Sequence, residues 1–218
     1  MSRPARRDGV ERREALLDAA LRCFDERGVL GTGIEEIRRA AGASPSSVYH
    51  FFDGLPGLTM ALLTRTFERL FTHLAARVTP TRSARTAVLA LVEGHLDWIL
   101  AHPAEGRFMY QAMSVEHGAE PMAALQAAKA EMLAPIAAHF GRFIAEGSLP
   151  ALPPIALDVI LLGPSHEACR RFLGGAPLDP AWMQKTLPRL AWQSVAPIHR
   201  RPRRPSDEAA LSAKRAKR

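Results

Sequence analysis

The chain has 218 residues, 47% of them hydrophobic and 6% aromatic, a composition that is typical of globular domains and excludes a disordered protein. No stretch reaches the apolar length of a membrane span and no signal peptide precedes the first predicted helix, so we expect a cytoplasmic protein without a membrane partner. The net charge is +7, but residues 200–218 carry +6 of it, so the body of the chain is close to neutral and its charge alone indicates no function.

The first predicted element is an amphipathic helix near the N-terminus. Apolar residues recur there at the spacing of one helical face, and Gly28 is placed to end the helix because it has no Cβ. These apolar residues are Leu16, Ala19, Ala20, Cys23 and Phe24.

A short second helix is predicted to follow. Thr32 can cap its N-terminus, and Glu35, three residues later, completes a capping box. Gly42 suits the left-handed backbone position that ends a helix. The pattern therefore predicts a helix of about two turns followed by a tight turn.

A third helix is predicted directly after this turn, from Pro45 to Phe51. Ser44 is a favourable N-cap, and Pro45 occupies the first helical position, where its missing N–H costs nothing. Val48 and Phe52 are expected to point inward. Two short helices around a glycine turn form a helix-turn-helix, whose second helix presents its N-terminal end to base edges in the major groove. The sequence thus predicts a DNA-binding protein.

The exposed face of the third helix is the expected DNA-contacting surface. Small residues let the helix approach the groove, and serine hydroxyls can meet either a donor or an acceptor on the bases. Tyr49 and His50 are long enough to reach phosphates. For Arg38 and Arg39 the sequence leaves open whether they contact DNA or stay solvated and pair with Glu35. The predicted DNA-contacting residues are Thr32, Arg38, Arg39, Ser44, Pro45, Ser46, Ser47, Tyr49 and His50.

The order of these features resembles the TetR family of bacterial transcriptional regulators. The chain carries in succession Ala-Leu-x-x-Phe in the first helix, a glycine, Thr-x-x-Glu-x-Ile, Ala-Gly-x-Ser and Val-Tyr-x-x-Phe. The close match spans residues 11–60, and beyond it only the helical layout agrees. In the family, the threonine and tyrosine that match Thr32 and Tyr49 contact phosphates.

The resemblance implies an all-α protein of about nine helices. Residues 1–52 would form the helix-turn-helix domain with a basic N-terminal arm, residues 53–199 a helical ligand-binding and dimerisation domain, and residues 200–218 a basic, disordered tail. It also implies a homodimer that acts on a palindromic operator in the bacterial nucleoid. Repression relieved by a small apolar effector is the family's default, and activation stays open.

Two features near the helix-turn-helix bear on DNA affinity. Many relatives carry a phosphate-contacting lysine after the Tyr-x-x-Phe motif, whereas this chain has Leu55 at that place. The third helix also contains no Lys or Arg. Arg3, Arg6 and Arg7 are expected to form a loose arm along the minor groove or the backbone. Few neutralised phosphates would make binding only weakly dependent on salt.

The rest of the chain is predicted to be helical, since Pro and Gly breaks separate apolar patterns of helical spacing. The expected helices are Leu58–Val78, Ser83–Ala101, Ala104–Val115, Pro121–Ala145, Ile155–Leu173 and Pro180–Val195.

Aromatic and methionine side chains concentrate in the middle of this region. Such a stripe is usually core, but the resemblance implies a small-molecule cavity between these helices, which the same residue types would suit. Arg107 and His166 are candidates for a polar contact within it. The predicted pocket residues are Phe67, Phe71, Leu96, Arg107, Phe108, Met113, Phe140, Phe143 and His166.

The last two predicted helices match the pair through which the family dimerises as a four-helix bundle. Trp182 and Trp192 are aromatic anchors of the kind enriched at interfaces, although an internal core face is the alternative. The predicted interface residues are Val159, Leu162, Cys169, Trp182, Leu190 and Trp192.

Nothing in the sequence favours an enzyme. The eight histidines form no metal-binding pair, and no glycine-rich phosphate loop or Gly-x-Ser-x-Gly motif is present. Cys23 and Cys169 stand among apolar helical positions and are expected to be buried free thiols. We therefore predict no metal, no cofactor and no catalytic residue.

One alternative function stays open, that of a helical DNA-binding or protein-interaction protein without ligand response. Its affinity for DNA would come from residues 200–218, which carry eight Lys or Arg against two acids.

Overall fold

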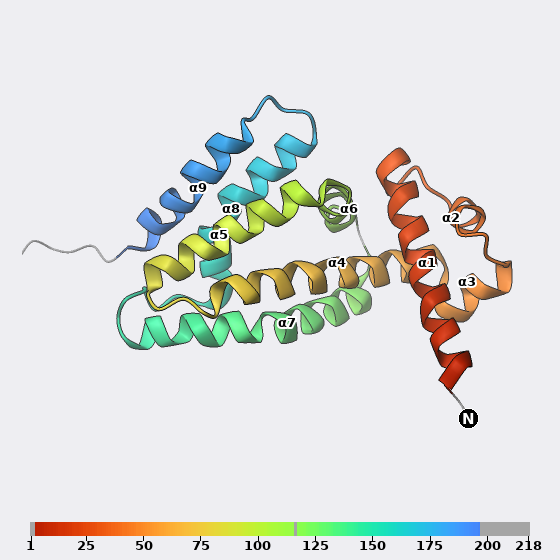
Figure 1. Cartoon of the computed structure of the whole chain (residues 1–218), viewed down its shortest axis with the longest axis horizontal. Coiled ribbons are helices and arrows are strands. Elements are labelled where there is room, and N and C mark those ends of the chain that lie inside the picture. Colours follow the sequence, from red (N-terminus) through yellow and green to blue (C-terminus); the bar gives the residue numbers. More distant parts are fainter. Residues whose placement is uncertain (1–2, 116, 197–218) are drawn as a thin grey trace, which may run out of the picture.

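The structure, a computed structural model, describes the backbone of residues 3–115 and 117–196 and the side chains from residue 9 within them. In this part of the chain every regular element is a helix, which confirms the all-α prediction (Figure 1). The helices are α1 (Arg3–Arg27), α2 (Ile34–Ala40), α3 (Pro45–Phe51), α4 (Gly54–Val78), α5 (Ala84–Ala101), α6 (Pro103–Met113), α7 (Ala119–Ala145), α8 (Pro154–Leu173) and α9 (Pro180–Val195). The predicted tail lies outside the described residues.

Three helices, α1 to α3, form a compact unit at one end of the molecule (Figure 1). Its core includes Leu16, Phe24 and Ile37, all 1% exposed or less, and the apolar stripe of α1 packs on α2, α4 and α6. Gly28 and Gly42 have positive φ angles of 78° and 62°, as their predicted places at helix ends require.

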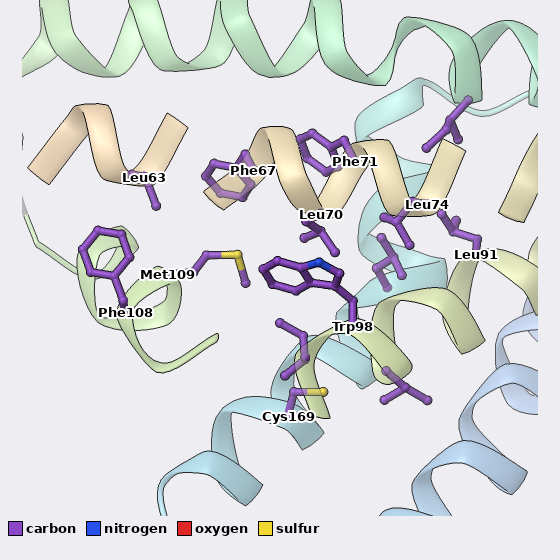
Figure 2. Close-up of a cluster of buried hydrophobic side chains, with 14 of the residues drawn as sticks. Leu63, Phe67, Leu70, Phe71, Leu74, Leu91, Trp98, Phe108, Met109 and Cys169 are labelled. Atoms are coloured by element: carbon purple, nitrogen blue, oxygen red, sulfur yellow. The ribbon is translucent and has the colours of Figure 1, made fainter. Parts of the chain in front are cut away.

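The helix α4 joins this unit to the remainder of the fold. It packs on α1 at one end and runs beside α7 and α5 for the rest of its length (Figure 1). Helices α8 and α9 pack on the far side of α5, and α6 lies between α1 and α8. A single apolar core therefore extends from the first helix to the last. Figure 2 shows its centre, where Trp98 lies close to Leu70 and Met109.

Most predicted helix boundaries agree with the structure to within a few residues, and Pro180–Val195 agrees at both ends. Helix α4 starts at Gly54, four residues before its predicted start at Leu58. Pro56 lies in the first turn of this helix, where a proline costs no intrahelical hydrogen bond.

The sequence predicted a loose arm that contains Arg3, Arg6 and Arg7. This prediction is wrong, because the backbone of these residues is helical and belongs to α1. Pro4 lies in the first turn of this helix, a place where proline is compatible with helical geometry. No described helix is long and apolar enough to cross a membrane.

Candidate DNA-binding surface and effector cavity

The helix α3 has the bounds that its capping residues predict. Ser44 is the N-cap, its Oγ accepts a hydrogen bond from the Ser47 backbone N–H at 3.3 Å, and Pro45 follows as the first helical residue. Val48 is buried, whereas Tyr49 is 64% exposed. The helix is therefore anchored by one face and presents the other to solvent.

Three serine hydroxyls gather at the start of this helix. The Oγ of Ser44 lies 3.0 Å from that of Ser46 and 2.8 Å from that of Ser47. Pro45 and His50 are exposed on the same helix, and the His50 ring packs edge-on against Phe51 at 4.9 Å. This surface offers neutral donors and acceptors that can exchange their present partners for others.

The prediction that Thr32 caps the second helix is wrong. Its side chain is buried, and its hydroxyl donates to the carbonyl oxygens of Gly28 at 2.9 Å and Cys23 at 3.2 Å. The N-cap of α2 is Gly33, whose N–H donates to the Glu36 carboxylate at 3.0 Å. Thr32 therefore ties the α1–α2 connection to the end of α1 and is not available to DNA.

The two arginines of α2 differ in their surroundings. Arg38 pairs with Glu35 at 2.8 Å and also donates to the Ala43 carbonyl oxygen at 3.0 Å, so it holds the turn between the two short helices. Arg39 is exposed, and its Nε donates to the Glu35 carbonyl oxygen at 3.3 Å. The Glu35 pairing left open by the sequence is present for Arg38, and Arg39 is the better placed of the two for a phosphate.

A cavity of about 280 Å³ lies between α4, α5, α6, α7 and α8. Four predicted pocket residues line it, namely Phe67, Phe71, Met113 and His166. The rings of Phe67 and Phe71 stack with their centroids 5.5 Å apart and form part of the apolar wall. Figure 2 shows both rings on α4, with Met109 of α6 nearby.

Five predicted pocket residues do not line this cavity, because helical spacing identifies an apolar face but not its neighbour. Leu96 and Phe143 are buried in the core. Phe108 stacks on Phe24 of α1 at 5.3 Å. Phe140 lines a smaller neighbouring space, and Arg107 pairs with an acid of α1.

The cavity wall contains a buried polar cluster that the sequence did not indicate as a unit. The Tyr110 hydroxyl lies 3.2 Å from Nδ1 of His166 and 3.4 Å from Nε2 of His95. His95 is fully buried, and its Nδ1 has no hydrogen-bond partner among the described residues. Burial lowers the pKa of His95 well below its ordinary value, and His166 adds to this effect. Burial also lowers the pKa of His166, although Asp158 opposes the shift. Both rings are therefore neutral at pH 7.

Two charged side chains also line the cavity. The Lys129 ammonium lies 4.5 Å from the centre of the Phe67 ring, a cation–π contact. Burial lowers the pKa of Lys129, and the opposite charge of Asp158 limits this shift. Asp158 itself lines both the main cavity and the smaller space.

A groove of about 510 Å³ lies between the loop that follows α1 on one side and α6 with the end of α8 on the other. Helix α6 makes two polar contacts with the end of α1 and the loop after it, from Arg107 Nε to Asp25 at 2.7 Å and from the Val29 N–H to the Gln111 side-chain oxygen at 3.1 Å. Tyr110 lines both this groove and the cavity. Helix α6 is thus in contact with both regions.

The predicted dimer surface is partly exposed in the protomer. Val159, Trp182 and Leu190 are large apolar side chains that remain open to solvent, and Trp192 is half-buried. The prediction of an interface position is wrong for Leu162 and Cys169, because both are buried inside the protomer and cannot contact a partner without rearrangement. The two cysteines are free and buried, as predicted.

Residues 16–55 of the chain match the family model "Bacterial regulatory proteins, tetR family". The HTH-type transcriptional regulator BetI of Rhizobium meliloti is 35% identical over 81 residues, which are 37% of this chain and 40% of that protein. BetI of Cronobacter sakazakii is 35% identical over 95 residues, 43% of this chain and 47% of its own length. The matched segments thus span less than half of these curated relatives.

Solved structures extend the similarity to most of the fold. A TetR family transcription regulator from Marinobacter aquaeolei VT8 superposes with a TM-score of 0.72 at 19% identity, over 88% of this chain and 98% of the other. The regulator FadR from Bacillus subtilis, solved in complex with stearoyl-CoA, gives a TM-score of 0.67 at 14% identity, over 82% and 96%. At these identities the agreement concerns the fold alone. Residues 16–55 of the chain therefore resemble the TetR family of bacterial regulators, and the overall fold is the one that these solved structures share.

Proposed function

We propose that this protein is a sequence-specific transcriptional regulator that reads DNA with α3. The observation that carries the proposal is the orientation of this helix, with Val48 in the core and Ser46, Tyr49 and His50 facing solvent. The exposed face is polar and small at its beginning, which suits entry into a major groove. Arg39 is close enough along the chain to add a phosphate contact.

The regulator acts as a homodimer on a palindromic operator. Ile155, Val159, Trp182 and Leu190 leave apolar surface exposed on the adjacent helices α8 and α9. Apolar surface of this kind is suited to an interface between identical subunits. Light scattering is expected to give a dimer, and Val159→Asp together with Leu190→Asp is expected to give a monomer that binds a half-site only weakly. A wild-type monomer at micromolar concentration contradicts the proposal.

A small molecule in the cavity relieves repression. Helix α6 carries Tyr110 in the cavity wall and Arg107 and Gln111 at the junction with α1, so a ligand that displaces α6 alters the support of the helix-turn-helix unit. The FadR neighbour was solved with a small-molecule ligand, which supports such a site in this fold. The ligand acts only through its different affinity for the two arrangements, so DNA weakens ligand binding by the same factor.

Footprinting on the DNA upstream of the protein's own gene tests the central claim. We expect protection of a palindrome, and Tyr49→Ala is expected to weaken binding about 5- to 100-fold, since one good contact contributes about 1–3 kcal/mol. Indifference of the footprint to Tyr49→Ala, Ser46→Ala and His50→Ala together would contradict reading by α3.

Deletion of residues 200–218 separates the proposal from the alternative. A regulator that reads sequence through α3 keeps its preference for the palindrome over random DNA after the deletion. A binder that depends on the basic tail loses most of its affinity for both.

A further inference from the structure

A second, largely apolar space adjoins the cavity. This second space measures about 150 Å³ and shares Leu74, Leu133, Asp158 and Leu162 with the first as common walls. We call the larger space, with His95, Tyr110 and His166 in its wall, the head compartment, and the smaller one the tail compartment. The remaining wall of the tail compartment is apolar and is formed by Leu91, Ile136, Ala137, Phe140, Ile144, Leu152, Pro154, Leu157 and Leu161.

The head compartment contains unused hydrogen-bonding capacity. The Tyr110 hydroxyl lies between two histidine nitrogens but has only one proton to donate. Nδ1 of His95 is buried without a partner, and an unsatisfied buried group costs about 1–3 kcal/mol. A polar ligand atom that reaches Tyr110 or His166 can use the hydrogen-bonding capacity that this single proton leaves open.

The charges in the head compartment oppose each other. Lys129 and Asp158 are the only charged side chains among its described lining residues, and one carries a positive and the other a negative charge. The two histidines are neutral, so the charges of the described lining residues sum to zero and favour no net charge on a ligand. A buried ion without its own counter-charge is costly, whereas a neutral polar group needs only hydrogen bonds.

We propose that the effector is an uncharged amphipathic molecule whose hydroxyl, ester or amide head contacts Tyr110 and His166 and whose short aliphatic chain occupies the tail compartment. This inference rests on the proposed function, because it assigns a ligand class to the effector site of that regulator. The two compartments together lie near the small end of the range for ligand pockets, about 300–1,000 Å³. A compact chain therefore fits better than a large conjugate.

Titration calorimetry with 1-octanol and with octanoate, both at pH 8 and without DNA, tests the proposal. We expect 1-octanol to bind the full chain and octanoate to bind at least about tenfold more weakly. Equal or tighter binding of octanoate overturns the uncharged head, and no binding of 1-octanol overturns the ligand class.

Tyr110→Phe tests the place of the head with little change in shape. Loss of one hydrogen bond is expected to weaken 1-octanol about 5- to 10-fold. His166→Asn is the second variant, with the same expectation. Thr79→Val, which also removes a hydroxyl but at the end of α4 outside both compartments, is the matched control. Unchanged 1-octanol affinity in both Tyr110→Phe and His166→Asn overturns the proposal.

The assay distinguishes this inference from the proposed function. If 1-octanol binds and depends on Tyr110 but no operator is protected, the regulator proposal fails and the ligand class stands. If a palindrome is protected but 1-octanol does not bind, the regulator stands and the ligand class fails.

Discussion

The exposed face of α3 and the head compartment of the cavity both gather small sets of neutral polar groups, yet their energetic situations are opposite. The serine hydroxyls at Ser44, Ser46 and Ser47 contact one another at a surface, where water can replace any partner they lose. The Nδ1 atom of His95 is buried and has no such replacement. The surface site can therefore exchange partners at little cost, whereas the buried nitrogen keeps the full cost of its missing hydrogen bond.

The largest effect on stability and DNA binding is expected at Val48, the residue that packs α3 into the core. Val48→Asp places a carboxylate at a position that is 1% exposed, which costs several kcal/mol and unfolds the small α1–α3 unit. We expect complete loss of DNA binding and a lower thermal midpoint. Ala15→Asp adds the same charge to an exposed position of α1 and is expected to change stability by less than about 0.5 kcal/mol. A folded Val48→Asp variant with normal DNA affinity contradicts the described packing.

The buried site predicts a dependence of stability on pH. The native pKa values of His95 and His166 lie below the ordinary value of about 6.5 that the unfolded chain has. Below pH 6.5 the unfolded chain therefore binds more protons, and the free energy of unfolding falls as the pH decreases. The slope is up to about 1.4 kcal/mol per pH unit for each histidine. Urea denaturation at pH 7.5, 6.5 and 5.5 measures it, and His95→Gln is expected to reduce it. Equal stability at pH 5.5 and 7.5 would speak against neutral burial.

Two serines of the surface site are expected to separate stability from DNA affinity. Ser44→Ala removes the N-cap of α3 and should cost about 1 kcal/mol of stability as well as DNA affinity. Ser46→Ala leaves the cap intact and should lower DNA affinity alone. Chemical denaturation and gel-shift titration of both variants check this difference, and an equal loss of stability in the two would refute it.

The smallest expected effect is on how strongly the affinity for DNA depends on salt concentration. No Lys or Arg lies on α3, and Leu55, at the start of α4, is half-buried. Each neutralised phosphate contributes about −0.9 to the slope of log affinity against log salt, so we expect a shallow slope for the chain lacking residues 200–218. A slope near −10 contradicts the assignment of neutral contacts. Leu55→Lys is expected to steepen the slope by about one phosphate.

How far the sequence predicted each site depends on the range of the interactions involved. Ser44 and Pro45 act on the backbone within one turn, so the bounds of α3 could be predicted in full. Thr32 has the same type of local signal, but its acceptors are the carbonyl oxygens of Cys23 and Gly28 at the end of another helix. Its burial is a result of tertiary packing that no capping rule contains.

The residues that line the cavity were harder still to predict, because they depend entirely on how separate helices pack together. Phe67 and Phe108 have similar helical patterns, yet the first lines the cavity and the second stacks on Phe24 across the domain junction. His95, Tyr110 and His166 come from three helices, and the spacing within each helix gives no register between them. His95 is one of eight histidines that form no pattern in the sequence, and only the fold shows that it is fully buried.

The two cysteines lie in different halves of the protein, so the reaction rate of each buried thiol reports how often its own half opens. Cys23 is buried in the helix-turn-helix unit and Cys169 beside Tyr110 in the other domain. Burial raises the pKa of both thiols, that of Cys169 to about 12, so neither reacts readily while its surroundings stay closed. The alkylation rates of the two sulfurs, followed by peptide mass spectrometry, therefore report separately how often each half exposes its interior.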